Sequence, residues 1–210
     1  MKKLREKEKL KIMNQETINQ IETEILLNKE KIFNNFDKGS LDSYEFIMKR
    51  FEEKNGKIKN DEEFRRKFKL FYRLSPAHLG IKFEDKYFEL LESGENDLEK
   101  VLRELYKIET LRKRKTIQFS FATKLLHTLD SSKPIFDSKV KDRLNIVMNG
   151  DNGEEKIYSS IKAYNDLQQK INQLSGREEV KKLIEEFKIK FHPSNSVSDI
   201  KILDFILWSW

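Results

Sequence analysis

The stretch TIQFSFATKLLHTL, residues 116–129, decides the fold class of this 210-residue chain. Ile117, Phe119 and Phe121 alternate with polar residues, as the residues of a half-buried strand do. No other segment of the chain offers an evident partner strand. We therefore predict a buried helix that runs to about Leu129, and an all-α fold that forms a single globular helical domain.

Apolar stripes on both sides of this segment predict further helices. The cleanest stripe begins at Leu98 and runs to Ile108. Residues 198–210 are apolar nearly all round, so we expect the last helix to lie inside the core. An Asn60–Glu63 pair has the spacing of a capping box, which predicts a helix start at Asn60. The remaining helices are expected at about residues 16–36, 41–51, 60–74, 83–91, 138–147, 154–174 and 178–191.

The amino-acid composition excludes several classes of fold and function. The chain holds 42 Lys and Arg against 36 Asp and Glu, a net charge of +6 that favours a polyanionic partner such as nucleic acid. Its 15 Phe exclude wholesale disorder, and only 7 Gly and 3 Pro disfavour an all-β fold. With no Cys, disulfides, Cys-ligated zinc, iron–sulfur clusters and thiol catalysis are excluded.

The hydropathy of the chain predicts its location, and its first residues differ from the rest. No apolar run approaches the roughly 20 residues of a membrane-spanning helix, so we expect a cytoplasmic protein without a membrane partner. Residues 1–15 are expected to be a basic N-terminal arm or a helix extension, and residues 16–210 the helical domain.

Lys124 and Asp137 are the candidate catalytic residues. Lys124 interrupts an apolar helix, where desolvation would lower its pKa and leave a neutral, nucleophilic amine suited to Schiff-base chemistry. Asp137 directly precedes the helix expected from Ser138, where its carboxylate can cap that helix. A fixed carboxylate near a lysine could activate water or stabilise positive charge on a sugar. The alternative is structural: a lysine at the edge of the stripe with its amine in solvent, and an aspartate that is only a cap.

The segments SFATKLLH (120–127) and KPIFDSKV (133–140) resemble bacterial proteins related to 8-oxoguanine DNA glycosylase, divergent members of the helix-hairpin-helix DNA glycosylase superfamily. Residues 199–208, with Asp204 and Trp208, are similar to the closing helix of that group. The resemblance implies that Lys124 attacks the sugar C1′ and that Asp137 assists. The chain departs from the pattern in two ways. Residues 119–122 (FSFA) replace the Gly-x-Gly of the hairpin, and the 13 positions between Lys124 and Asp137 are fewer than in well-known members.

The function that the resemblance implies is a DNA glycosylase, with or without abasic lyase activity, that excises a damaged or modified base in DNA repair or anti-phage defence. The target base would be flipped into a pocket and stacked on aromatic side chains. Candidate substrate-binding residues are Phe71, Tyr72, Arg73, His127, Trp208 and Trp210. Candidate contacts to DNA phosphates are Arg112, Lys113, Arg114, Lys115, Lys139, Lys141 and Arg143. The alternative is a catalytically inactive nucleic-acid-binding or protein-interaction module on the same fold.

No metal or cofactor is expected. The three histidines, His78, His127 and His192, are far apart and lack the spacing of a helical zinc site. His127 stands three residues after Lys124 and would share its helix face. The chain has no phosphate-cradling glycine loop and no dinucleotide fingerprint.

Overall fold

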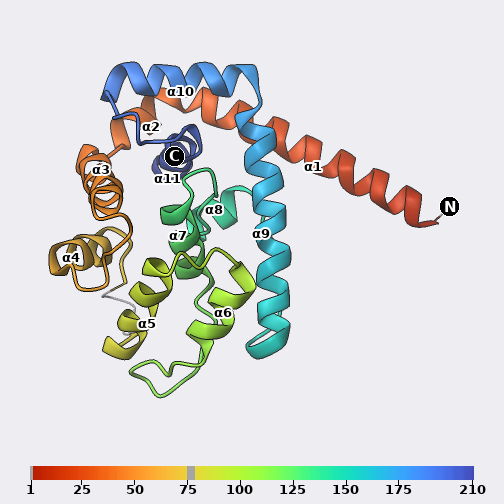
Figure 1. Cartoon of the computed structure of the whole chain (residues 1–210). Helices are drawn as coiled ribbons and strands as arrows, with labels where there is room; N and C mark the ends of the chain where they lie inside the picture. The colour runs from red at the N-terminus through yellow and green to blue at the C-terminus, as the bar shows by residue number, and fades with distance from the viewer. Residues whose placement is uncertain (1, 75–78) are drawn as a thin grey trace.

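The computed structural model describes the backbone of residues 2–74 and 79–210 and the side chains of residues 15–74 and 79–210. Within these ranges every regular element is a helix, so the predicted all-α class is confirmed (Figure 1). Ser75, Pro76, His78 and the basic side chains of the first 14 residues lie outside the described part. The helices are α1 (Lys2–Leu27), α2 (Lys29–Asn35), α3 (Lys38–Glu53), α4 (Glu62–Phe71), α5 (Ile81–Glu92), α6 (Leu98–Tyr106), α7 (Phe119–Leu129), α8 (Ser138–Arg143), α9 (Gly153–Ser175), α10 (Glu178–Phe191) and α11 (Asp199–Ser209).

Residues 119–129, for which a strand was the alternative, form α7, the predicted buried helix. α7 lies in the middle of the molecule and packs against α5 and α6 (Figure 1). Phe119, Phe121 and Leu125 are buried, and the Tyr87 hydroxyl donates a hydrogen bond of 3.0 Å to the Phe121 carbonyl. Burial on nearly all sides explains why the segment looks uniformly apolar rather than amphipathic.

The C-terminal helix α11 is also a core element, as predicted. It packs against α2, α8, α9 and α10, and Figure 1 shows it surrounded by other helices. Ile202, Leu203, Ile206 and Leu207 have no solvent exposure. The Ser198 hydroxyl caps the helix by accepting a hydrogen bond from the Lys201 amide.

The N-terminal helix α1 runs without a break from Lys2 to Leu27, across the boundary expected at residue 15. Its first half projects past α9 (Figure 1). Further along, Ile18, Ile21 and Ile25 are buried where α1 packs against α9 and α10. The described backbone of the first residues is therefore helical, as in the helix extension considered above.

Several predicted helix boundaries are wrong. The single helix expected at about residues 16–36 is divided at Asn28 into α1 and α2. The cap of α4 is Asp61 rather than Asn60, because the Asp61 carboxylate accepts hydrogen bonds from both the Phe64 amide and the Arg50 guanidinium. α8 ends at Arg143 instead of continuing to about residue 147. Just after this end, Asn145 has a left-handed φ of 49°. The buried Lys170 ammonium donates a hydrogen bond of 3.0 Å to the Leu144 carbonyl.

None of the helices in the described part of the chain is long and apolar enough to cross a membrane.

Candidate active site

Lys124 projects from α7 into a partly closed environment. Its ammonium donates a hydrogen bond of 3.3 Å to the Tyr72 carbonyl at the end of α4 and lies 4.8 Å from the centroid of the Phe121 ring. Burial lowers the pKa of Lys124 to about 8, against the opposing effect of the negative charges of Asp137 and Asp204. A substantial fraction of this amine is therefore neutral near pH 8, which is the state that attacks carbon.

Asp137 interacts electrostatically with Lys124, and a hydrogen bond joins the residues just before them. The Phe136 amide donates a hydrogen bond of 3.0 Å to the hydroxyl of Thr123, so the residues that precede the two candidate catalytic positions are bonded to each other. The Asp137 carboxylate also caps α8, because it accepts a 2.8 Å hydrogen bond from the Val140 amide. Burial and the nearby charge of Asp204 raise the pKa of Asp137, whereas the cap bond and the charge of Lys124 oppose this change.

A buried ion pair in α11 completes the charged cluster. Lys201 and Asp204 are 3% and 9% exposed, and their Nζ and Oδ2 atoms lie 2.6 Å apart. The Lys201 ammonium also lies 4.4 Å from the ring centroid of Phe205 and 5.0 Å from that of Tyr44. The charges of both residues act on Lys124 and Asp137, so all four groups belong to one electrostatic cluster.

Sequence reasoning missed Lys201 and assigned no role to Asp204. The signal was present, since two opposite charges three residues apart interrupt a helix that is otherwise apolar on every side. Such charges are buried only when they are paired.

Arg73, Trp208 and Lys139 meet at the surface beside this cluster. The Lys139 ammonium lies 3.8 Å and the Arg73 guanidinium 5.9 Å from the ring centroid of Trp208, which is 39% exposed. Lys139 also donates a hydrogen bond of 3.0 Å to the Trp208 carbonyl. Arg73 carries a positive charge that lowers the pKa of Lys124, which places this surface next to the candidate catalytic amine.

Two further predicted residues, Arg143 and Trp210, pair with each other. The Arg143 guanidinium lies 4.3 Å from the Trp210 ring centroid and donates a hydrogen bond to the Trp210 carbonyl. Arg143 therefore ties α8 to the end of α11, where the positive charge also complements the helix dipole.

Phe71, Tyr72 and His127 lie in the interior rather than in an open wall. Tyr72 is 4% exposed and reaches Lys124 through its carbonyl, and Phe71 is half-buried. His127 is fully buried, and its hydrogen bonds go to Tyr44 and Lys133 rather than to Lys124. Its Nδ1–H donates to the Lys133 carbonyl at 2.6 Å, so Nε2 accepts from the Tyr44 hydroxyl at 2.9 Å. Burial lowers the pKa of His127 to about 4, which keeps the ring neutral.

The predicted phosphate contacts Arg112, Lys113, Arg114 and Lys115 are exposed in the loop that joins α6 to α7. The Thr110 amide donates a hydrogen bond of 2.9 Å to the Arg114 carbonyl, which closes a tight turn with Arg112 and Lys113 at its tip. Lys141, the remaining predicted contact, lies on α8.

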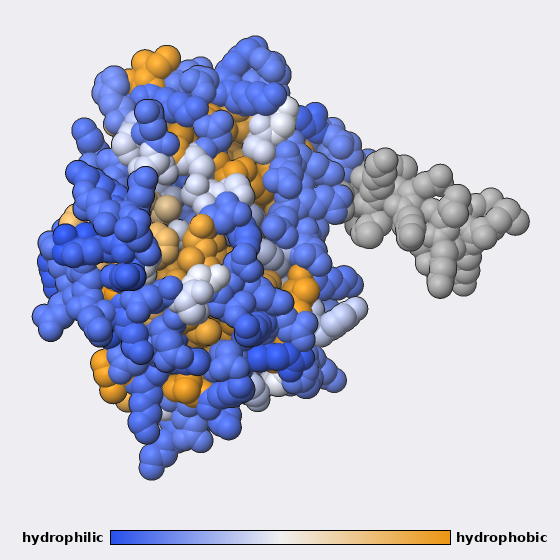
Figure 2. Space-filling model, in the orientation of Figure 1, coloured by the Kyte–Doolittle hydropathy of each residue, from blue (hydrophilic) through white to orange (hydrophobic). Residues whose placement is uncertain are grey.

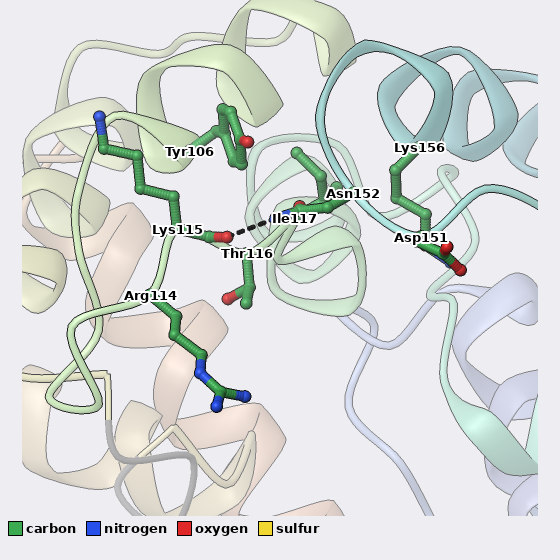
Figure 3. Close-up of a pocket in the computed structure, with 8 residues that line it drawn as sticks. All are labelled: Tyr106, Arg114, Lys115, Thr116, Ile117, Asp151, Asn152 and Lys156. Atoms are coloured by element: carbon green, nitrogen blue, oxygen red, sulfur yellow. Dashed lines mark hydrogen bonds between the residues drawn. The ribbon is translucent and has the colours of Figure 1, made fainter.

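A surface hollow of about 550 Å³ adjoins this loop, between residues 114–117 and the Asp151–Asn152 segment (Figure 3). Asn152 holds its two walls together through a 2.6 Å hydrogen bond to the Lys115 carbonyl. Figure 3 shows that the side chains of Arg114 and Lys115 point away from Asn152. Arg114, Lys115 and Lys156 line the hollow together with a single acidic residue, Asp151, whereas Lys124 does not line it.

No family model, curated protein or solved structure matches the chain.

The chemistry of the site therefore follows from its own geometry. The structure brings together a partly buried amine, a fixed carboxylate and a cationic, aromatic surface next to them. The face drawn in Figure 2 is largely hydrophilic, with apolar and neutral residues gathered along its middle. This arrangement can add an amine to an electrophilic carbon and move a proton between an amine and a carboxylate.

Proposed function

We propose that the chain is a DNA glycosylase, with or without abasic lyase activity, that acts through Lys124 and Asp137. The observation that carries the proposal is a half-buried amine of pKa about 8 that interacts electrostatically with the Asp137 carboxylate, while the residues just before the two positions are joined by the Thr123–Phe136 hydrogen bond. A solvated surface lysine would have a pKa near 10.4 and would be almost entirely protonated at neutral pH.

In the proposed reaction, the neutral Lys124 amine attacks C1′ of a flipped nucleotide. A C–N bond forms to Lys124 while the glycosidic C–N bond breaks, and the base leaves with that electron pair and is protonated. Asp137 accepts the proton that the attacking amine loses. The sugar ring then opens to an imine, from which loss of a C2′ proton and departure of the 3′ phosphate break the strand. Water hydrolyses the imine and restores the amine.

The loop between α6 and α7 supports binding to DNA. It presents Arg112 and Lys113 at the tip of a closed turn, with Arg114 and Lys115 beside them. Exposed Lys and Arg contribute affinity for the phosphate backbone that is independent of base sequence. The sequence resemblance over residues 120–127 and 133–140 points to the same class of reaction.

A catalytically inactive DNA-binding module on the same fold is the second candidate. The observation that favours it is the FSFA segment at residues 119–122, which stands where the superfamily has glycines. Phe119 and Phe121 are buried in the core, so this segment does not offer the open backbone of a Gly-x-Gly hairpin.

Borohydride trapping on a panel of oligonucleotides separates the two candidates. The panel contains 8-oxoguanine, uracil, hydroxymethylcytosine and an abasic site, and each is tested with wild type and with Lys124→Ala. A covalent adduct with wild type that is absent with Lys124→Ala supports the lyase, and the trapped lesion identifies the substrate. Release of free base without an adduct supports a glycosylase that lacks lyase chemistry. Salt-sensitive binding with neither product supports the inactive module.

A further inference from the structure

The surface formed by Arg73, Trp208 and Lys139, here called the Trp208 surface, has an excess of positive charge. Both cations lie against one indole ring, so they are separated by no more than the sum of their distances from its centroid, 5.9 and 3.8 Å. Neither Arg73 nor Lys139 takes part in any ion pair among the described residues. Two like charges held this close, with no counter-ion from the protein, favour an anionic ligand.

The two carboxylates of the adjoining cluster are already engaged. Asp204 pairs with Lys201 at 2.6 Å, and Asp137 accepts the cap hydrogen bond of α8. Neither carboxylate forms an ion pair with Arg73 or Lys139 in the described structure. The Trp208 surface therefore keeps its positive charge although two aspartates lie in the adjoining cluster.

The Trp208 surface is also connected to both candidate catalytic residues. Arg73 directly follows Tyr72, whose carbonyl accepts the hydrogen bond of Lys124. Lys139 stands two residues after Asp137, in the first turn of α8. An anion bound between the two cations would therefore lie next to a molecule whose reacting carbon is at Lys124.

Arg73 occupies a backbone conformation that glycine usually supplies. Its φ is 56°, and the Leu74 amide donates to the Lys69 carbonyl at 3.0 Å, the arrangement of a Schellman turn at the end of α4. A non-glycine residue in this region adopts a conformation of higher energy. The turn places the exposed Arg73 guanidinium near Trp208. A glycine at this position would have no side chain to contact Trp208.

We propose that the Trp208 surface is a phosphate subsite, which binds the phosphate carried by the deoxyribose that reacts with Lys124. The identity of the reacting sugar rests on the proposed function, whereas phosphate binding itself does not. The Arg73 guanidinium can bind two phosphate oxygens in a fork, and the Lys139 ammonium contributes a point charge. The smallest complete ligand is therefore a phosphorylated deoxyribose with a free aldehyde.

Trapping with two small sugars tests the subsite. Wild type is incubated with sodium cyanoborohydride and either 2-deoxyribose or 2-deoxyribose 5-phosphate, and the adduct on Lys124 is measured by peptide mass spectrometry. The amine and the aldehyde form an imine with loss of water, and the hydride converts it to a stable secondary amine. We expect half-maximal labelling at a concentration about tenfold lower for the phosphorylated sugar, because it gains charge-assisted hydrogen bonds.

The variant is Arg73→Gln with Lys139→Gln, and the matched control is Lys49→Gln, an exposed lysine on α3. The ratio between the two sugars is compared within each protein, so a change in Lys124 reactivity cancels. The ratio should fall to about one in the double variant and stay unchanged in the control. Isothermal titration with inorganic phosphate should show saturable binding to wild type that the double variant lacks.

The outcomes separate the subsite from the proposed function. Equal labelling by both sugars in wild type, or a preference that survives in the double variant, overturns the subsite while labelling of Lys124 still supports the proposed function. No labelling by either sugar, together with phosphate binding that the double variant loses, overturns imine formation at Lys124 and supports the subsite. Absence of both labelling and phosphate binding overturns both.

Discussion

The amide of Phe136 donates a 3.0 Å hydrogen bond to the side-chain hydroxyl of Thr123, and both groups are buried. This bond joins α7 to the loop before α8 at the positions just before Lys124 and Asp137. It links two residues that are 13 positions apart in the chain, and each of them directly precedes a candidate catalytic residue.

Thr123→Val should therefore weaken both the fold and the site. Valine keeps the shape of the side chain but leaves the Phe136 amide without a partner, which should lower the free energy of unfolding by about 1–3 kcal/mol. Urea unfolding measures this loss, and trapping on an abasic oligonucleotide should also fall. Thr23→Val on the exposed face of α1 is the control and should change neither quantity. Unchanged trapping in a folded Thr123→Val protein would show that the bond does not position Asp137.

The rate of imine formation should rise with pH around the Lys124 pKa of about 8. Four charged groups act on this amine: the negative charges of Asp137 and Asp204 raise its pKa, and the positive charges of Lys201 and Arg73 lower it. Asp137→Asn should therefore shift the midpoint of the pH–rate profile downward, and Arg73→Gln should shift it upward. Single-turnover trapping from roughly two pH units below to two above the Lys124 pKa of about 8 measures both shifts. Shifts of the same sign would contradict this electrostatic assignment.

His127 should make the fold sensitive to acid. Its pKa is about 4 in the folded chain against an ordinary value of 6.5, so the unfolded chain binds the proton more tightly. The stabilising effect is complete above the unfolded pKa and is lost as the pH falls from 6.5 toward 4. By linkage the loss is on the order of 3 kcal/mol. Chemical denaturation at several pH values should show a flatter profile for His127→Gln than for wild type.

The Lys201–Asp204 pair should behave non-additively. Asp204→Leu leaves the Lys201 ammonium buried without a counter-charge and should cost about 3–5 kcal/mol of stability. Adding Lys201→Met removes that uncompensated charge and should recover most of the loss. Thermal or urea unfolding of the two single variants and the double variant measures the coupling. Additive losses would show that the two charges do not depend on each other.

The helices could be predicted from sequence because their apolar stripes are local. Residues 119–129 form the expected helix, and the uniformly apolar α11 lies in the core as expected. Boundaries that depend on distant partners were less predictable. Asp61 displaces Asn60 as the cap because Arg50 of α3 also binds its carboxylate, and Lys170 of α9 fixes the end of α8.

The candidate site was predictable only in part. Lys124 and Asp137 follow from the residues and the resemblance, but the Thr123–Phe136 bond between their neighbours depends on a tertiary contact. Lys201 enters the cluster because α11 packs beside α8, a relation between segments roughly 60 residues apart in sequence that no periodicity encodes. His127 shares a helix with Lys124, yet the packing of α3 turns its hydrogen bonds toward Tyr44.

The most direct test of the account is to locate the covalent adduct after borohydride trapping on an abasic oligonucleotide. Proteolysis and mass spectrometry assign the modified residue among the many lysines of the chain. We predict an adduct on Lys124 in wild type, and loss of adduct formation in Lys124→Ala without loss of folding. An adduct on another lysine, or the same yield with Lys124→Ala, would contradict it.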